Sequence, residues 1–243
     1  MGIKGIKDLK YAAVAFDLDG TLYPNIALFY RLVPFLMKEQ RLIRAMGKAR
    51  TQLRELDRSS GRNSGDRTPE EFYETQARIM GEILHEPSEI IKERTERMIY
   101  RGWEPIFKRI NPFPYVRDML DTFQKEGIKM GLLSDFPPET KLENLKLTGY
   151  WDAVVCSELT GHLKPDSAPF LELSNRMGTL PGSILYVGNS VPYDVDGASR
   201  AGMKTALIRT GWKRLFPGNS GSEGIAADFV FSDYRQLREY VLN

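Results

Sequence analysis

Short runs of apolar residues alternate with helical patterns along most of the chain. Residues 11–16 form the first run, and its continuous apolar character predicts a buried strand. Five later runs predict further strands, at residues 128–133, 153–156, 184–187, 205–208 and 228–231. Helical spacing predicts helices between them, at residues 115–125, 140–148, 168–177, 194–201 and 236–242. Apolar strands that alternate with helices are typical of a parallel sheet covered on both faces, so we predict a Rossmann-like α/β fold.

The stretch from residue 24 to residue 110 has a different pattern. Residues 26–58 have helical spacing with almost no strand-like segments, and two further helices are predicted at about 68–84 and 89–100. Thr68, Pro69 and Glu71 are typical of a helix start, while the Gly- and Ser-rich residues 59–67 predict a mobile loop. We therefore predict an all-helical insertion at 24–110, within a core formed by residues 1–23 and 111–243.

Composition narrows the function classes. The chain has 243 residues, 42% hydrophobic residues, 27% charged residues and a net charge of +2, which suit a globular protein and give no basis for nucleic-acid binding. The absence of an apolar run of about 20 residues predicts no membrane span. Cys156 is the single cysteine, which favours a reducing, cytoplasmic setting. The protein is expected to be a monomer or a dimer. Two histidines and one cysteine disfavour zinc, so a divalent metal is expected to be magnesium held by oxygen atoms.

Polar side chains follow four of the predicted strands. In parallel sheets, ligands bind beyond the carboxyl ends of the strands, so these groups are expected to meet at one edge. A carboxylate, a hydroxyl, a lysine and amide or acidic oxygens can together hold an oxyanion beside magnesium. The residues are Asp17 and Asp19 after the first strand, Ser134 after the second, Lys164 after the third, and Asn189 with Asp194 after the fourth.

Four motifs in this order resemble those of the haloacid dehalogenase superfamily. Their sequences are DLDGT at 17–21, LLSD at 132–135, GHLKPD at 161–166, and VGNS at 187–190 with Asp194 and Gly197-Ala198. The resemblance covers nearly the whole chain and favours the phosphatase-like branch. It implies that the helical insertion at 24–110 is the cap of this superfamily.

The resemblance implies a role for each motif. Asp17 would attack phosphorus and form an aspartyl-phosphate, and Asp19 would act as general acid and base. Ser134 and the backbone N–H of Asp135 would hold phosphoryl oxygens, with Thr21 also at the substrate site, and Lys164 would pair with both the phosphate and Asp17. Magnesium would be held by Asp17, the backbone carbonyl of Asp19, and Asn189 or Asp194. The substrate would be a small phosphorylated molecule.

Other activities stay open at this point. Many relatives have Asp at the position of Asn189, whose amide would bring no charge to the metal. Dehalogenases of the superfamily lack the second carboxylate of the first motif, so Asp19 favours phosphate-ester hydrolysis. Phosphonate cleavage, phosphosugar mutation and a non-catalytic binding protein on the same fold are further alternatives.

Two groups of residues are expected to play no part in the chemistry. The two histidines, His85 and His162, are expected to be bystanders. The basic residues of the helical segment at 26–58 are expected to form a solvated face; they are Arg41, Arg44, Lys48, Arg50, Arg54 and Arg58. As an alternative, Arg41, Arg44 and Lys48 would contact an anionic substrate. Chain crossings near Tyr23-Pro24 and residues 111–114 are expected to act as hinges between cap and core.

Overall fold

The computed structural model describes residues 10–25, 33, 37–60, 67–102, 107–108, 110–210 and 226–243. Most of the predicted loop at 59–67 lies outside these residues. The strands are β1 Ala13–Asp17, β2 Lys129–Ser134, β3 Ala153–Cys156, β4 Ile184–Gly188, β5 Lys204–Ile208 and β6 Phe229–Phe231. The α-helices are α2 Gln40–Ser60, α3 Pro69–Leu84, α4 Ser88–Thr95, α6 Val116–Lys125, α7 Glu139–Leu145, α8 Ser167–Met177, α9 Asp196–Arg200 and α10 Tyr234–Leu242. Short 3₁₀ or π-helical turns are η1 Glu96–Tyr100, η2 Thr148–Tyr150, η3 Ser157–Thr160, η4 Pro181–Ser183 and η5 Val191–Val195.

The six strands form one parallel sheet in the order β3-β2-β1-β4-β5-β6. This confirms the predicted α/β class. The chain reverses its direction across the sheet between β1 and β4, and such a switch point is where open α/β sheets bind ligands. All five residues of β1 are buried, because helices cover the sheet on both sides.

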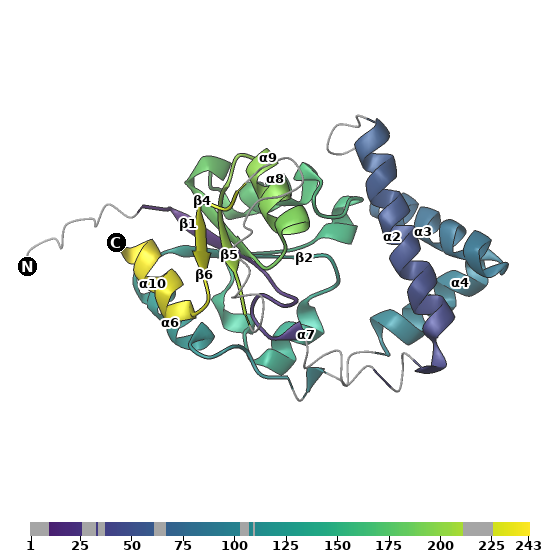
Figure 1. Ribbon diagram of the computed structural model, residues 1–243, viewed down its shortest axis with the longest axis horizontal. Coiled ribbons are helices and arrows are strands. Elements are labelled where there is room, and N and C mark those ends of the chain that lie inside the picture. Colours follow the sequence, from purple (N-terminus) through teal and green to yellow (C-terminus); the bar gives the residue numbers. More distant parts are fainter. Residues whose placement is uncertain are drawn as a thin grey trace, which may run out of the picture.

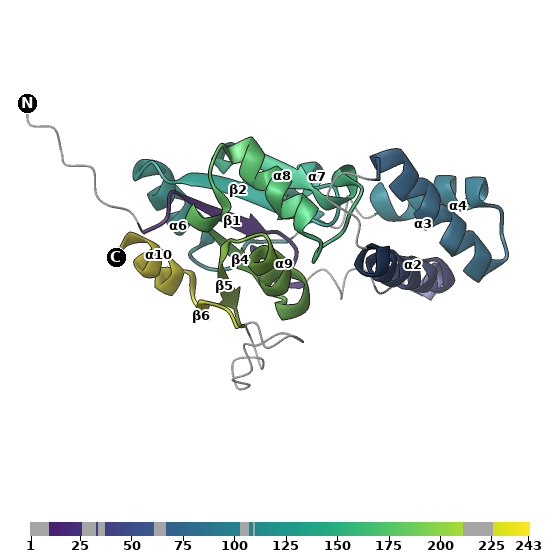
Figure 2. The ribbon, with the colours of Figure 1, turned by 90° about the horizontal axis from the view of Figure 1, so that it is seen from above.

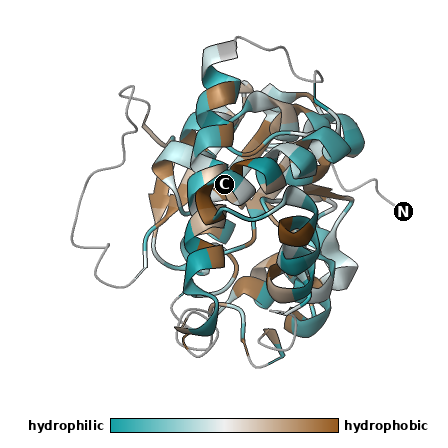
Figure 3. Cartoon of the chain, turned by 90° about the vertical axis from the view of Figure 1, so that its right-hand side faces the viewer, coloured by the Kyte–Doolittle hydropathy of each residue, from teal (hydrophilic) through white to brown (hydrophobic). Residues whose placement is uncertain are grey.

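Two separate hydrophobic clusters show how the helices cover the sheet. On one face, α6, α7 and α10 pack on alternate strand residues such as Val14 and Phe16. On the other face, α8 and α9 pack on the intervening residues, among them Ala13 and Ala15 (Figure 1). The period-two alternation of the strand places its residues in different clusters. The helices in view carry both hydrophobic and hydrophilic residues, as amphipathic packing requires (Figure 3).

The helices α2, α3 and α4 lie together at one end of the molecule (Figures 1 and 2). They form a third hydrophobic cluster, to which the core contributes Leu163 and the partly buried Phe136. The predicted start of α3 is confirmed, because Thr68 and Glu71 form a capping box. The residues of 26–100 that the structure describes include helices and no strand, whereas the exact boundary of the insertion at 24–110 stays a prediction.

Several elements differ from the prediction at their ends or in the type of helix. Helix α6 begins at Val116, because Tyr115 has a left-handed φ of 66°. Helix α7 ends at Leu145 because Lys146 is left-handed. The predicted helix at 194–201 is a π-helical turn, η5, followed by α9. None of the helices in the described part of the chain is long and apolar enough to span a membrane.

Candidate active site

The carboxyl edge of the sheet brings together residues from four segments of the chain. Asp17 is the last residue of β1 and Ser134 the last of β2. The loop after β3 carries Lys164, and Asn189 follows β4. The predicted convergence is therefore present at the switch point of the sheet.

Lys164 lies at the centre of the site. Its Nζ is 2.6 Å from Oδ1 of Asp17 and 2.7 Å from Oδ1 of Asp194, and all three residues are buried. The hydroxyl of Tyr186 lies 3.4 Å from the same nitrogen. One ammonium group is thus shared by two carboxylates, which leaves the cluster with a net negative charge that a further cation or a positively charged contact would offset.

Asp17 has an unusual electrostatic environment for a carboxylate. Burial raises the pKa of Asp17 to about 7, with the charges of Asp194 and Asp19 acting in the same direction and Lys164 opposing them. The hydroxyl of Thr21 donates a hydrogen bond of 2.7 Å to Oδ2 of Asp17. Hydrogen bonds thus hold both oxygens of the Asp17 carboxylate within a buried site, as a preorganised nucleophile requires.

Two side chains contact the carboxylate of Asp19, one through an ammonium group and one through a hydroxyl group. Nζ of Lys141 lies 2.8 Å from its Oδ1 and 2.6 Å from its Oδ2, and the hydroxyl of Tyr23 also donates to Oδ1. The sequence predicted Asp19 but neither partner. Lys141 lies in α7, which has an ordinary helical pattern, so only the fold reveals that its side chain reaches the end of β1.

The turn after β1 depends on Gly20. Its φ is +87°, and a Cβ at this position would lie 1.9 Å from Nδ2 of Asn189. The space left by glycine lets Nδ2 of Asn189 donate a 2.9 Å hydrogen bond to the backbone carbonyl of Asp19. Asn189 therefore contacts the carbonyl that the sequence analysis assigned to the metal.

The residues expected to hold magnesium fit a hard cation. Asp17, Asp194 and the carbonyl of Asp19 all offer oxygen atoms, the ligands that magnesium prefers. Oδ2 of Asp194 accepts hydrogen bonds of 3.1 and 3.0 Å from the backbone N–H groups of Asn189 and Ser190, which fixes this carboxylate. A rotation of the Asn189 amide by half a turn would replace its nitrogen by its oxygen at the same place.

Ser134 and Asp135 end β2 as predicted. Ser134 is fully buried, and its Oγ accepts a 3.2 Å hydrogen bond from the backbone N–H of Phe136. The carboxylate of Asp135 accepts hydrogen bonds from Arg54 at 2.9 Å and from the backbone N–H of Lys164 at 3.2 Å. Burial alone would raise the pKa of Asp135, but the nearby positive charges of Lys164, Arg50 and Arg54 outweigh it and lower that pKa.

The prediction of a solvated basic face on α2 is wrong for two residues. Arg41, Arg44 and Lys48 are exposed, but Arg50 is buried and forms an ion pair with Glu158 of the core. Nε of Arg54 donates a 2.7 Å hydrogen bond to the carbonyl of Lys164. Helical spacing places both guanidinium groups on the side of α2 that faces the core, where carboxylates compensate their charge.

His162 has carboxylate neighbours, and its expected lack of a part in the chemistry stays a prediction. His162 is fully buried, with Nδ1 3.5 Å from Asp57 of α2 and 3.8 Å from Asp166 of its own loop. Asp57 also pairs with Arg67 at 2.8 Å. Possible metal-ligand atoms of Asp57, His162 and Asp166 lie within 4.8 Å of one another. However, Arg67 already supplies the positive charge that Asp57 requires. His162 thus connects α2 with the loop that carries Lys164.

The fold and the edge residues define a Rossmann-like α/β enzyme with a carboxylate-lysine site at its switch point. The chain belongs to the haloacid dehalogenase-like hydrolases, because the model of that family matches residues 11–202. It is therefore a hydrolase, and the suspected superfamily is confirmed.

Several individual proteins are similar to most of the chain. A glyceraldehyde 3-phosphate phosphatase of Methanopyrus kandleri is 29% identical, over 94% of this chain and 96% of that protein. A phosphoglycolate phosphatase of Shigella sonnei is 27% identical, over 82% of this chain and 81% of that protein. Among solved structures, an L-2-haloacid dehalogenase of Xanthobacter autotrophicus superposes with a TM-score of 0.64 at 19% identity, covering 95% and 98% of the two chains. This last similarity shows a shared fold.

Proposed function

We propose that this hydrolase is a magnesium-dependent phosphatase that cleaves a small phosphorylated metabolite through an aspartyl-phosphate on Asp17. The observation that carries the proposal is the pairing of Asp17 with Lys164 beside a second carboxylate, Asp19. Two curated relatives named as phosphatases of small phosphorylated metabolites support the same reaction class.

The proposed reaction has two displacements. In the first, a carboxylate oxygen of Asp17 forms a bond to phosphorus while the bond from phosphorus to the leaving oxygen breaks, and Asp19 gives that oxygen a proton. In the second, Asp19 takes a proton from a water molecule that attacks phosphorus, which releases inorganic phosphate and restores Asp17. Lys164, Ser134 and the N–H of Asp135 would hold the phosphoryl oxygens throughout, with Thr21 fixing the nucleophile.

Asp17, the Asp19 carbonyl, Asp194 and Asn189 would hold magnesium. The bound ion would reduce the repulsion between the phosphoryl group and the carboxylates. The two-carboxylate cluster around Lys164 supports this assignment, because its net charge is negative.

Residues 24–110 would form a cap domain over the site, joined to a core of 1–23 and 111–243. Contacts from α2 and η1 to the loops after β2 and β3 support this division. Closure of a cap excludes water while the intermediate forms. The buried, free Cys156 supports a reducing compartment such as the cytoplasm.

The alternative activities predict different requirements. Dehalogenation needs no general acid for an alcohol leaving group, whereas Asp19 lies beside Asp17 with two fixed partners. Phosphonate cleavage, phosphosugar mutation and a non-catalytic role have no specific observation in their favour among the described residues.

Steady-state hydrolysis of phosphate monoesters tests the proposal. The wild-type protein should release phosphate with magnesium and lose this activity with a chelator. Asp17→Asn keeps the shape of the side chain but removes the nucleophile, so turnover should fall by about three orders of magnitude or more. Unchanged turnover in this variant, or equal turnover in the chelator, would contradict the proposal.

A further inference from the structure

Lys141 is a buried cation that the proposed reaction does not use. It is 7% exposed, projects from α7, and its Nζ contacts both oxygens of Asp19. Since Asp19 is assigned to the leaving oxygen, Lys141 lies on the leaving-group side of the site. Lys164, in contrast, lies on the side of the nucleophile, at Asp17.

Besides the Asp19 carboxylate, two aromatic rings lie close to Lys141. Its ammonium group is 5.3 Å from the ring centre of Phe107 and 5.4 Å from that of Phe136. A small cavity of about 60 Å³ lies against it, lined also by Ile99, Tyr100 and Pro137. A water molecule needs about 10–15 Å³ by this measure, so the cavity has room for a group of only a few heavy atoms. A buried ammonium group beside aromatic rings attracts an anion that enters the cavity, in addition to the Asp19 carboxylate that it already contacts.

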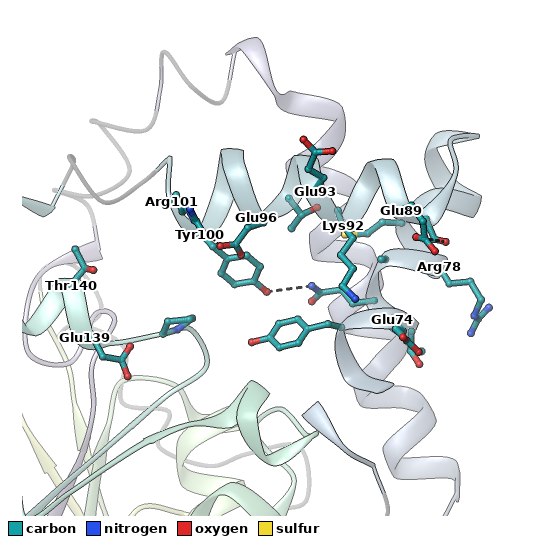
Figure 4. A pocket seen from close by; sticks show the side chains of 18 residues that line it. Glu74, Arg78, Glu89, Lys92, Glu93, Glu96, Tyr100, Arg101, Glu139 and Thr140 are labelled. Atoms are coloured by element: carbon teal, nitrogen blue, oxygen red, sulfur yellow. Dashed lines mark hydrogen bonds and ion pairs between the residues drawn. The ribbon is translucent and has the colours of Figure 1, made fainter. Parts of the chain in front are cut away.

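The small cavity continues into a groove of about 1260 Å³ between the helices α3 and α4 and the start of α7. Tyr100, Glu139 and Thr140 line both spaces. Figure 4 shows Tyr100 of η1 on the cap side of this groove, with Glu139 and Thr140 on the opposite side. The groove carries charges of both signs, including Glu74 and Lys92, whereas Lys141 lines the small cavity beside it.

We propose that Lys141 is a specificity residue that selects phosphate esters whose leaving group carries a carboxylate close to the ester oxygen. This inference rests on the proposed phosphatase activity. A leaving oxygen beside Asp19 places the next two atoms of the substrate at the small cavity, within reach of the ammonium group. A carboxylate there forms a charge-assisted hydrogen bond with Lys141, whereas a neutral group does not. The substrate class is therefore the short phosphorylated hydroxy acids.

The competing explanation is that Lys141 only orients Asp19. That role predicts an equal loss for every substrate when Lys141 is replaced, because Asp19 protonates every leaving group. Recognition of a carboxylate predicts a loss that depends on the charge of the leaving group. A ratio between substrates separates the two roles, because a general effect on Asp19 cancels in it.

Three phosphate esters of the same length provide the test. They are 2-phosphoglycolate, 2-hydroxyethyl phosphate and phosphoethanolamine, whose leaving groups end in an anion, a neutral group and a cation. For the wild-type protein, kcat/KM should be about 10- to 100-fold higher for 2-phosphoglycolate than for 2-hydroxyethyl phosphate, the size expected for a hydrogen bond between charged groups. Phosphoethanolamine should be the poorest of the three.

Lys141→Met should reduce this preference to less than about threefold, mainly through a higher KM for 2-phosphoglycolate. Lys141→Arg, which keeps the charge, should retain part of it. Lys125→Met removes an exposed lysine of α6 and should leave the preference unchanged. Equal losses on all three esters in Lys141→Met, or a wild-type protein with no preference, would overturn the inference.

A binding measurement separates failure of this inference from failure of the proposed function. Calorimetry with Asp17→Asn and magnesium measures affinity for the same three esters without turnover. If 2-phosphoglycolate binds at least tenfold more tightly than 2-hydroxyethyl phosphate only when Lys141 is present, the inference holds even if the wild-type protein hydrolyses none of them. If all three bind equally, the inference is wrong even if the protein is an active phosphatase.

Discussion

At the scale of single residues, the main feature of the site is that lysine side chains compensate the negative charges of its carboxylates. Lys164 compensates Asp17 and Asp194, and Lys141 compensates Asp19. Removing one partner of a buried ion pair is costly, since it leaves the other charge without compensation. The two lysines thus stabilise three carboxylates that would otherwise repel one another at the carboxyl edge of the sheet.

Asn189→Asp tests the assignment of the metal ligands. If Asn189 holds magnesium through its amide oxygen, a carboxylate at this position adds a negative charge beside the cation. We expect activity to saturate at a magnesium concentration several-fold lower than for the parent protein. Asp194→Asn should shift saturation the other way. A titration of activity against magnesium for both variants checks this, and an unchanged midpoint in Asn189→Asp would show that Asn189 only shapes the loop.

Gly20→Ala tests the close approach of the first and fourth motifs. An added Cβ would lie 1.9 Å from Nδ2 of Asn189 in a backbone with a φ of +87°, so the turn and Asn189 must move apart. We expect turnover to fall at least tenfold and the free energy of unfolding to fall by about 2 kcal/mol or more.

Gly127→Ala is the matched control for this variant. Gly127 also has a positive φ, of +71°, but a Cβ there meets no atom within 4 Å. It should lose about 1 kcal/mol of stability from backbone strain alone, with turnover unchanged. Equal turnover in Gly20→Ala and Gly127→Ala would contradict the account. Urea unfolding and steady-state kinetics of both variants provide the comparison.

The site residues that sequence could predict are those tied to strand ends. Asp17 and Ser134 follow apolar runs that are easily recognised, and a parallel sheet gathers such ends at one edge. Lys141 and Tyr23 were not predicted, because their roles depend on which way one helix and one turn project. No pattern in the sequence encodes that direction before the sheet order is known.

At the scale of elements, α2 connects the helical segment with two loops of the core. Arg54 contacts the backbone of Lys164 and the carboxylate of Asp135, and Arg50 reaches Glu158 of η3. The hydroxyl groups of Tyr73 and Tyr100 donate to the same glutamate, at 3.1 and 3.0 Å. The loops after β2 and β3 and the helical segment are thus joined by shared hydrogen-bond partners.

Asp135→Asn tests this connection and has a defined pH dependence. The pKa of Asp135 is lowered in the folded protein, so its contribution to stability is present above the ordinary value near 4 and is lost as pH falls through the folded value. The variant should be about 3 kcal/mol less stable at pH 7, because Arg50 and Arg54 lose a buried partner.

The stability difference caused by Asp135→Asn should shrink as the pH is lowered below about 4, because Asp135 takes up a proton there in the unfolded chain while it stays ionised in the folded protein down to its lowered pKa. Urea unfolding at a series of pH values measures it. Glu55→Gln, which alters an exposed carboxylate of α2, serves as control and should change stability little at any pH. A difference for Asp135→Asn that stays constant down to pH 3 would contradict the assigned ion pairs.

The elements themselves were largely predictable. The strands and most core helices were found within about two residues, because each has a clear apolar pattern. The basic residues of α2 were assigned to solvent because a charged helix position is usually exposed. Arg50 and Arg54 differ because carboxylates of other segments face them, which a one-dimensional pattern does not contain.

At the scale of the whole molecule, a large groove and a small cavity lie where the helical segment meets the α/β core. The outer groove lies between α3, α4 and α7, and the inner cavity is lined by Lys141, whose ammonium group contacts Asp19. A leaving group could thus extend toward solvent while the phosphoryl group stays at Asp17. Motion of the cap about the crossings near Tyr23-Pro24 and 111–114 stays a prediction, and it would have to separate Arg50 from Glu158.

The central claim is that Asp17 becomes phosphorylated during turnover. Rapid acid quenching of the enzyme with a phosphate monoester and magnesium, followed by digestion and mass spectrometry, measures this directly. We predict a phosphoryl group on the peptide that contains Asp17, formed at least as fast as turnover and absent from Asp17→Asn. A phosphoryl group on another residue during turnover would contradict the account. So would the absence of any phosphoryl group on the enzyme under conditions in which the intermediate forms faster than it is hydrolysed.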